Sequence, residues 1–348
     1  MTDQNSQGNW YDSKWNNPRA RKNKARRRAK FAARETPDVL SYSKNSNREE
    51  AGSFTGVVAE PQKNACLILA NDQQIVCKYS RKLWDSGGSP VVGDQVTFDR
   101  LDQNCGIIRT VLPRRSKIVR MRADSSRRSE FAREEHILAA NVDIAVIVAS
   151  AAAPPFHPRL IDRYLIVCEF GNVSPLICVN KIDLVEEQPD LTIYKHLHIP
   201  VVYVSAESEA GLDELREMLH GKYCVLTGQS GVGKSSIINR LIGREVLQVG
   251  EVGGRAGKGR HTTTVSTLHK LDGETYLVDT PGIRSLGLWE VDKATLRLYF
   301  PDLETHAPDC KFRNCLHTIE PACAVREAAE HSSMLKDRYA SYLRMMNE

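Results

Sequence analysis

One segment, Gly228-Gln-Ser-Gly-Val-Gly-Lys-Ser235, constrains this 348-residue chain more than any other. An apolar run that ends at Leu226 comes directly before it, and a helical pattern begins near Ser235. A glycine-rich turn between a strand and a helix lets backbone N–H groups surround a phosphate, with the helix N-terminus behind them. The segment therefore predicts a strand–loop–helix unit of an α/β sheet that binds a nucleoside phosphate.

The residue types in this loop predict distinct roles. Lys234 is expected to bridge the β- and γ-phosphates, and the Ser235 hydroxyl to hold Mg²⁺. The residues expected to contact the nucleotide are Gly228, Gln229, Ser230, Gly231, Val232, Gly233, Lys234, Ser235 and Ser236.

A second motif, Asn180-Lys-Ile-Asp183, indicates which base is bound. The Asp183 carboxylate can accept two hydrogen bonds from guanine, whereas adenine would leave this charged acceptor unpaired. Lys181 can lay its stem along the base, and the Ser205-Ala206 backbone can donate to the guanine oxygen. The candidate base-binding residues are Asn180, Lys181, Ile182, Asp183, Ser205 and Ala206.

A third motif, Asp279-Thr-Pro-Gly282, has the character of a γ-phosphate sensor. Asp279 is expected to reach Mg²⁺ through water and Gly282 to offer its amide to the γ-phosphate, and hydrolysis would then release the segment. The glycine-rich, basic segment 253–264 precedes it and ends in three threonines, one of which we expect on Mg²⁺, with Thr263 favoured. The alternative is that this segment is only a flexible surface loop.

The residue after Gly282 is Ile283, where Ras-like enzymes carry a glutamine that orients the attacking water. Isoleucine cannot hydrogen-bond, so another group must hold the water, and His261 is the nearest polar candidate. The alternative is that His261 is an exposed loop residue without this role. The candidate catalytic residues are thus Lys234, His261 and Thr263, and the intrinsic rate is expected to be slow.

An ordinary GTPase has the phosphate loop first and the guanine motif last. In this chain the guanine motif comes first and the phosphate loop follows it, so the order of the motifs is rotated. Circular permutation keeps the site in space while moving the chain ends, so the segment after Gly282 follows directly on the γ-phosphate sensor. Apolar strands alternate with helical patterns from about residue 142 to residue 282, which predicts a parallel sheet covered on both faces. Each motif begins where a strand ends, as ligand sites of open α/β sheets do.

The region before this sheet predicts short strands separated by Gly, Pro, Asn and Asp turns. Five strands in about sixty residues are typical of a small oligonucleotide-binding (OB) barrel, although such barrels also serve as plain packing modules. The expected strands are 54–59, 65–69, 74–78, 95–98 and 106–111.

Near the C-terminus, four soft ligands fall within fourteen residues in the pattern C-x4-C-x-H-x5-C. This is the complement of a closed tetrahedral zinc site, which would be structural because it leaves no position for water. The predicted ligands are Cys310, Cys315, His317 and Cys323, between helical stretches at 292–300 and 324–346. The remaining cysteines are expected to be buried small hydrophobes: Cys66, Cys77, Cys105, Cys168, Cys178 and Cys224.

The first 35 residues carry a net charge of +7, whereas the whole chain carries +5. This arm has few apolar residues, so we expect it to be disordered and to neutralise RNA phosphates; the alternative is a solubilising extension. Because no stretch of eighteen uncharged apolar residues occurs, neither a membrane span nor secretion is expected.

Together, the rotated order, the GQSGVGKS loop, the GRHTTT switch, DTPG and the Cys/His tail resemble the ribosome small-subunit-dependent GTPase A family over residues 50–348. The resemblance implies a multi-domain chain in which an all-β OB-type barrel precedes a circularly permuted α/β P-loop GTPase domain and a small α-helical zinc-finger domain. The expected boundaries are an arm and linker at 1–50, a barrel at 51–113, a GTPase domain at 114–287 and a zinc domain at 288–348.

The resemblance also supports His261 as the water-orienting group. It implies a cytoplasmic GTPase that acts late in small-subunit assembly, touches ribosomal RNA and is stimulated by the subunit, with GTP, GDP, Mg²⁺ and one zinc ion as ligands. A monomer without membrane contact is expected. The alternative is a non-catalytic RNA-binding or interaction protein that uses GTP only as a folding ligand.

Overall fold

The computed structural model describes residues 53–85, 89–121, 135–243, 266–279 and 293–347. The predicted basic arm lies outside these ranges.

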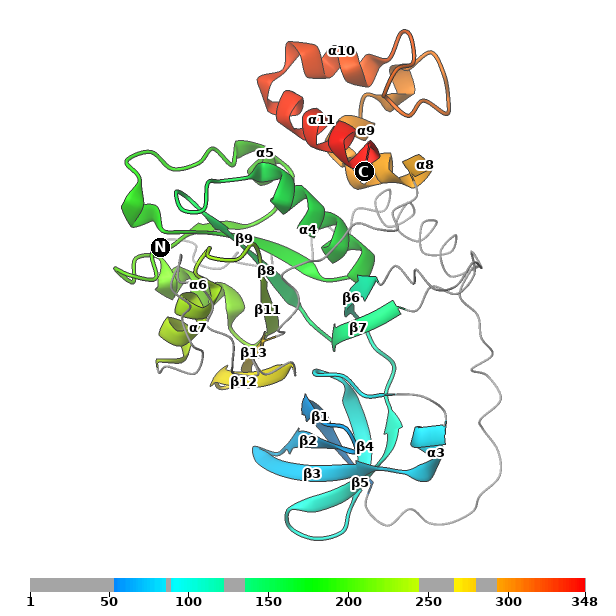
Figure 1. Cartoon of the computed structure of the whole chain (residues 1–348), viewed down its shortest axis with the longest axis vertical. Coiled ribbons are helices and arrows are strands. Elements are labelled where there is room, and N and C mark those ends of the chain that lie inside the picture. The colour runs from blue at the N-terminus through cyan, green and yellow to red at the C-terminus, as the bar shows by residue number, and fades with distance from the viewer. Residues whose placement is uncertain (1–52, 86–88, 122–134, 244–265, 280–292, 348) are drawn as a thin grey trace, which may run out of the picture. The chain divides into compact units, whose positions relative to one another are not determined.

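The first described strands close into a barrel of order β1-β2-β3-β5-β4 (Figure 1). Its core is formed by side chains that alternate along the strands, among them Ile68, Ile75, Phe98 and Ile108, all fully buried. A short helix, α3 (Arg81–Asp85), connects β3 to β4. The OB-type barrel predicted from the turns is therefore confirmed, and all five expected strands are present. They are β1 (Ser53–Pro61), β2 (Ala65–Ala70), β3 (Gln73–Tyr79), β4 (Gln95–Arg100) and β5 (Cys105–Val111).

Two strands that follow the barrel were not expected from the sequence. β6 (Lys117–Met121) pairs antiparallel with β7 (Glu135–Ala140) in a separate two-stranded sheet. The sequence gives no tight-turn signal between them, so their pairing could not be anticipated from local chemistry.

The central sheet has six strands in the order β10-β9-β8-β11-β13-β12 (Figure 1). Five neighbouring strands run parallel, as predicted, while the edge strand β12 runs antiparallel to β13 and was missed. The strands are β8 (Ile144–Ser150), β9 (Ser174–Asn180), β10 (Val201–Tyr203), β11 (Tyr223–Thr227), β12 (Thr267–Asp272) and β13 (Thr275–Asp279).

Both faces of this sheet are covered by helices, because its strands are apolar on both sides. On β8, Ala145 and Ile147 pack toward α4 (Pro158–Gly171) and α5 (Thr192–His196). The intervening Val146 and Val148 pack toward α6 (Leu212–Leu219) and α7 (Lys234–Ile242). A short 3-10 helix, Ile182–Leu184, follows β9.

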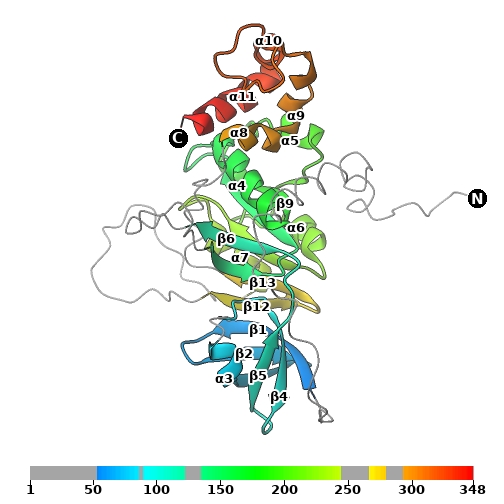
Figure 2. The same cartoon turned by 90° about the vertical axis from the view of Figure 1, so that its right-hand side faces the viewer.

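The C-terminal region is helical, and its helices gather around their own core (Figure 1, Figure 2). This core contains Phe300 and Tyr342, whose rings meet edge to face at 5.4 Å, and also Ile166 of α4. The predicted helical stretch 324–346 is broken at Ser332, whose side chain accepts a hydrogen bond from the Leu335 backbone and caps the second helix. The helices are α8 (Lys293–Leu296), α9 (Pro301–Glu304), α10 (Ala324–His331) and α11 (Ser333–Met346), with 3-10 turns at Arg297–Tyr299 and Ala307–Asp309.

Among the described helices, none has the length and apolar character that crossing a bilayer would require.

Candidate functional site

The motifs predicted from the sequence meet at one edge of the central sheet. Asn180 is the last residue of β9, and Gly228 directly follows β11. Ser205 lies two residues beyond β10, and Asp279 ends β13. Because these four strands run parallel, their carboxyl ends bring all four motifs to the same side.

Asn180 joins three of the motifs through its side chain, which is 1% exposed. Its Nδ2 donates to the Val232 carbonyl oxygen at 2.8 Å, and its Oδ1 accepts from the Ala206 backbone at 3.1 Å. A buried amide with both ends bonded fixes its surroundings, because moving either partner would leave a polar group unpaired. The guanine motif, the Ser-Ala motif and the phosphate loop are therefore joined directly to one another. In this structure the Ala206 N–H, expected to face the guanine oxygen, is bonded to Asn180 instead.

The neighbouring Lys181 reaches the phosphate loop from the same strand end. Its Nζ donates to the Gly231 carbonyl oxygen at 2.8 Å and also to the carbonyl oxygen of Ala153. Ser205, fully buried, donates through Oγ to the carboxylate of Asp183. Asp183 itself is exposed. Its carboxylate is therefore oriented by the buried Ser205 and remains accessible to a ligand from solvent. This is the arrangement that reading a guanine base requires.

The phosphate loop has the backbone that its glycines predict. Gly228 and Gly233 have φ of +141° and +95°, values that L side chains rarely adopt. A Cβ on Gly233 would lie 2.2 Å from Nδ2 of Asn180, and one on Gly228 would lie 2.2 Å from the Val148 carbonyl oxygen. Helix α7 begins at Lys234, whose Nζ donates to the carbonyl oxygens of Gly228 and Gln229 at 2.9 and 2.7 Å.

Some predicted site residues lie outside the described part of the chain. These are His261, Thr263 and Gly282. Their roles, and the role of Asp279, stay predictions.

The structure adds supporting residues that no sequence motif indicated. Arg240 of α7 donates to the Ala206 carbonyl oxygen at 3.0 Å and to Glu209 at 2.9 Å, which holds the Ser-Ala loop against the helix. Tyr164 of α4 lines a small pocket beside Gln229 of the phosphate loop. Burial raises the pKa of Tyr164, while a hydrogen bond with the Gly228 backbone acts in the opposite direction. Neither residue belongs to a spacing pattern, so the sequence carried no signal for them.

The Cys/His cluster is assembled as predicted. The ligand atoms of Cys310, Cys315, His317 and Cys323 all lie within 4.8 Å of one another. Nδ1 of His317 lies 3.6 Å from Sγ of Cys310 and 3.5 Å from Sγ of Cys323, and these two sulfurs are 4.0 Å apart. A tetrahedral zinc–thiolate site has sulfurs about 3.8 Å apart. The cluster can therefore hold a metal ion, and zinc fits its donors and spacing.

The surroundings of the cluster favour this use. Burial lowers the pKa of His317 and so favours the neutral imidazole that metals bind. Tyr339 donates to the His317 carbonyl oxygen at 2.8 Å, and the Glu320 carboxylate accepts from the backbone of Leu316 and Thr318 at 2.8 Å each. The loop is thus held by its own hydrogen bonds.

Of the six other cysteines, five are buried as expected: Cys66, Cys77, Cys168, Cys178 and Cys224. For Cys105 the expectation of a buried small hydrophobe is wrong. This residue is only partly buried, and its Sγ donates to the Asp102 carboxylate at 2.8 Å.

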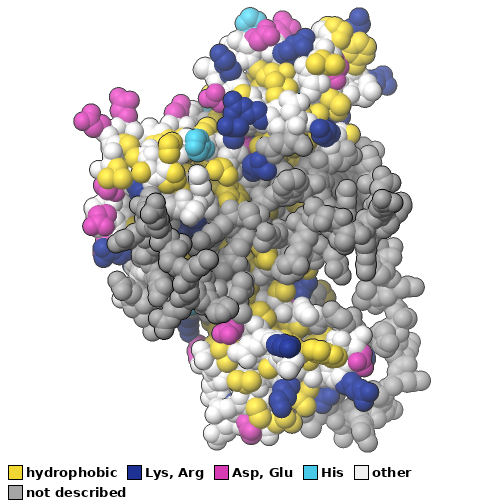
Figure 3. All heavy atoms as spheres, viewed as in Figure 1, with side chains coloured by type: hydrophobic (Ala, Val, Ile, Leu, Met, Phe, Trp, Pro, Cys, Tyr) yellow, Lys and Arg dark blue, Asp and Glu magenta, His cyan; other side chains and the backbone are white. Residues whose placement is uncertain are grey.

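The barrel exposes both aromatic and basic side chains. Phe54 and Trp84 are 41% and 59% exposed, and the Arg81 side chain is 96% exposed. On the face drawn in Figure 3, basic and hydrophobic side chains are interspersed over the barrel. Aromatic faces beside cations suit single-stranded nucleic acid, for which OB barrels are a common platform.

Fold and site together define a circularly permuted P-loop GTPase with an N-terminal barrel and a C-terminal Cys/His module. Comparison with known proteins agrees: residues 111–289 match the family model described as RsgA GTPase. The chain therefore belongs to the RsgA GTPase family, and it is a GTP hydrolase.

Individual relatives cover most of the chain. A protein of Chlorobaculum tepidum, named small ribosomal subunit biogenesis GTPase RsgA, is 42% identical over 74% of this chain and 84% of its own length. One of Alkaliphilus metalliredigens with the same name is 35% identical over 81% of this chain and 92% of its own. The crystal structure of YjeQ from Thermotoga maritima matches with a TM-score of 0.65 at 29% identity, over 85% of this chain and 98% of that one. The crystal structure of YloQ, titled a circularly permuted GTPase, matches with a TM-score of 0.66 at 25% identity, over 87% of this chain and 97% of that one.

Proposed function

We propose that this GTPase binds the small ribosomal subunit, acts late in its maturation, and hydrolyses GTP to GDP and phosphate with turnover that the subunit raises. The support is the similarity to relatives named small ribosomal subunit biogenesis GTPases, which extends over 74% to 81% of the chain. The aligned lengths, 263 and 286 residues, exceed the span of the family-model match at 111–289, so the similarity extends beyond the nucleotide site.

In the proposed site, Asp183 reads guanine, and Lys234 swings from its backbone acceptors to the β- and γ-phosphates. Mg²⁺ would be held by Ser235 and Thr263, with Asp279 acting through water. Because Ile283 cannot orient water, His261 is proposed to do so, with turnover that rises when the small subunit is bound.

The flanking parts are proposed to bind ribosomal RNA. The arm at residues 1–50 would contribute charge, the barrel at 51–113 would contribute exposed aromatics and cations, and the module at 288–348 would be held in shape by zinc. Residues 114–287 form the proposed GTPase domain. We propose a monomer that works in the cytoplasm, where ribosomal subunits mature, without membrane contact.

The decisive experiment measures GTP turnover by the full chain with purified small subunits, large subunits and neither. Small subunits are expected to raise kcat by about tenfold or more, on the scale by which partners that complete a GTPase site accelerate it. Large subunits serve as the control for non-specific RNA and should have little effect. Equal rates in all three conditions would refute the proposal.

A further inference from the structure

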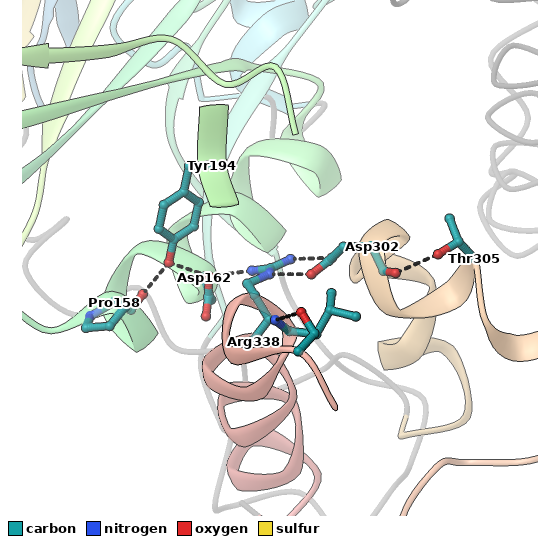
Figure 4. Close-up of polar contacts among 8 residues, drawn as sticks. Pro158, Asp162, Tyr194, Asp302, Thr305 and Arg338 are labelled. Atoms are coloured by element: carbon teal, nitrogen blue, oxygen red, sulfur yellow. Dashed lines mark hydrogen bonds and ion pairs between the residues drawn. The ribbon is translucent and has the colours of Figure 1, made fainter. Parts of the chain in front are cut away.

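A buried cluster of charges joins the C-terminal helices to the GTPase domain (Figure 4). At its centre is Arg338 of α11, whose side chain is 3% exposed. Its guanidinium bonds Asp162 of α4, and through two parallel bonds of 3.0 Å it also bonds Asp302 of α9. The hydroxyl of Tyr194, from α5, lies 2.8 Å from Oδ1 of Asp162 and 3.1 Å from the Pro158 carbonyl oxygen. We call Asp162, Tyr194, Asp302 and Arg338 the Arg338 cluster.

Stability alone is a poor explanation for this cluster. One guanidinium serves two buried carboxylates, and among the described residues Oδ2 of Asp162 is buried without a hydrogen-bond partner. Taking three charges out of water is costly before their attraction is counted, so well-packed apolar residues would hold two modules together at least as well. What bidentate ion pairing adds is a fixed geometry.

The position of Asp162 shows that the ion pairs fix the placement of α4 against the C-terminal module. Asp162 and Ile166 lie one helical turn apart on α4, and both contact the C-terminal module: Ile166 belongs to the core around Phe300. Tyr164 and Ile161 instead line the small pocket beside Gln229 and the phosphate loop. Helix α4 is therefore held between the C-terminal module and the phosphate loop.

The start of α4 has a second connection to the nucleotide site. Pro158, the first residue of the helix, contacts Tyr194 through its carbonyl oxygen. Five residues earlier, Ala153 supplies a carbonyl oxygen to Lys181 of the guanine motif. A shift of the first turn of α4 would therefore displace groups beside the phosphate loop and beside Lys181 of the guanine motif.

We propose that Arg338 is a positioning residue for GTP hydrolysis: by holding Asp162, it sets the place of α4 and, through α4, that of the phosphate loop. Arg338 itself bonds Asp162 and Asp302, neither of which is a candidate nucleotide-binding residue. If the C-terminal module moved when a partner bound it, the displacement would thus be transmitted to the catalytic site by two routes. One is the packing of Arg338 and α4, and the other is the chain that connects the module to the GTPase domain.

The test compares full-length variants for kcat and KM with GTP, with and without small subunits, alongside melting temperature and zinc content. Arg338→Met and Asp162→Asn are each expected to lower kcat about fivefold at temperatures well below melting, with zinc content unchanged. The double variant should be no slower than either single one, since both remove the same ion pair. Arg338→Lys, which keeps the charge, should recover part of the rate. Arg344→Met, an exposed arginine on the same helix, is the matched control and should behave as the parent.

A lower melting temperature with unchanged kcat in both single variants would show that Arg338 is merely structural and would overturn the inference, as would additive effects in the double variant. Should Arg338→Met melt below the assay temperature, Asp162→Asn carries the test, because it leaves Arg338 paired with Asp302. The inference rests on GTP hydrolysis and not on the subunit. A parent that subunits fail to stimulate would refute the proposed function, while the variants would still be compared on intrinsic turnover.

Discussion

The side-chain amide of Asn180 donates to the carbonyl oxygen of Val232 at 2.8 Å, across 52 positions of the chain. This bond connects the motif that reads the base to the loop that surrounds the phosphates. Because the two motifs stand in reversed order along the chain, the bond also shows that the permuted chain still brings them together. The space for it exists because position 233 has no side chain.

Gly233→Ala should therefore disrupt the pocket. The new Cβ would lie 2.2 Å from Nδ2 of Asn180, and the residue would keep an unfavourable φ of +95°. We expect GTP affinity to fall about tenfold or more, since strain and a broken buried hydrogen bond each cost at least about 1 kcal/mol. Isothermal titration calorimetry with GDP and GTP measures this.

The matched control is Gly243→Ala at the end of the same helix. Its φ is +73°, yet a Cβ there would meet nothing within 4 Å. It should cost about 1 kcal/mol of stability and leave nucleotide affinity unchanged. Equal affinity losses in both variants would show that backbone strain, and not the collision with Asn180, is responsible.

Asp183→Asn should remove guanine selectivity. The carboxylate is the acceptor for two guanine hydrogen bonds, and an amide would turn a donor toward the base. Affinity for GTP is expected to fall about 100-fold, from the loss of two charge-assisted bonds, while weak affinity for ATP should stay unchanged. Competition binding with both nucleotides gives the ratio. Glu187→Gln, an exposed acid on the same loop, is the control, and an Asp183→Asn variant that kept its GTP preference would contradict the assignment.

Lys234→Ala should abolish turnover. Its ammonium group now bonds two carbonyl oxygens of the loop and is the cation best placed to meet the β- and γ-phosphates. We expect kcat to fall by about 100-fold or more, as when one preorganised donor is removed from a transition state. Lys222→Ala, an exposed lysine just before β11, should hydrolyse GTP normally. Parental turnover in Lys234→Ala would indicate that the site binds GTP without acting on it.

The arm at residues 1–50 should govern the salt dependence of subunit binding. With a net charge of +7 in its first 35 residues, it would release counterions from RNA on contact. Deleting residues 2–35 should weaken binding to small subunits and flatten the fall of affinity with rising salt. Sedimentation binding at several potassium chloride concentrations tests this. If the slope is unchanged by the deletion, the arm is a solubilising extension.

The sequence predicted the parts whose chemistry is local. The loop from Gly228 to Ser235 needs glycines at fixed positions, and the barrel strands end at Gly, Pro, Asn and Asp turns, so both could be located without a structure. The Cys/His spacing likewise predicted a cluster that the fold assembles within 4.8 Å.

Long-range pairing could not be predicted in this way. The edge strand β12 exists because it pairs antiparallel with β13, and its sequence, Thr-Leu-His-Lys-Leu-Asp, is mostly polar and has no strong strand signal. Asp162 and Arg338 are 176 positions apart, and each resembles an ordinary surface residue of an amphipathic helix. Only the packing of α11 on α4 buries these two charges between the modules.

Glu320 should stabilise the metal-binding loop in a pH-dependent way. Burial alone would raise the pKa of Glu320, but the backbone N–H groups of Leu316 and Thr318 lower it to about 2. A glutamate in the unfolded chain has a pKa of about 4.3, so this stabilisation is complete above that pH and is lost as the pH falls toward about 2. Glu320→Gln should cost about 2 kcal/mol at neutral pH and weaken zinc retention against a chelator. Glu330→Gln, an exposed acid on α10, is the control.

Melting curves of the zinc-loaded parent and both variants, recorded from pH 7 to pH 2, separate this effect from protonation of the thiolates. Acid removes the metal from every variant, so thiolate protonation is common to them all. The difference between parent and Glu320→Gln should instead shrink below about pH 4.3, as the parent's own carboxylate gains its proton. A difference that stayed constant throughout would mean that Glu320 acts through packing, and its three backbone hydrogen bonds would then be incidental to holding the loop.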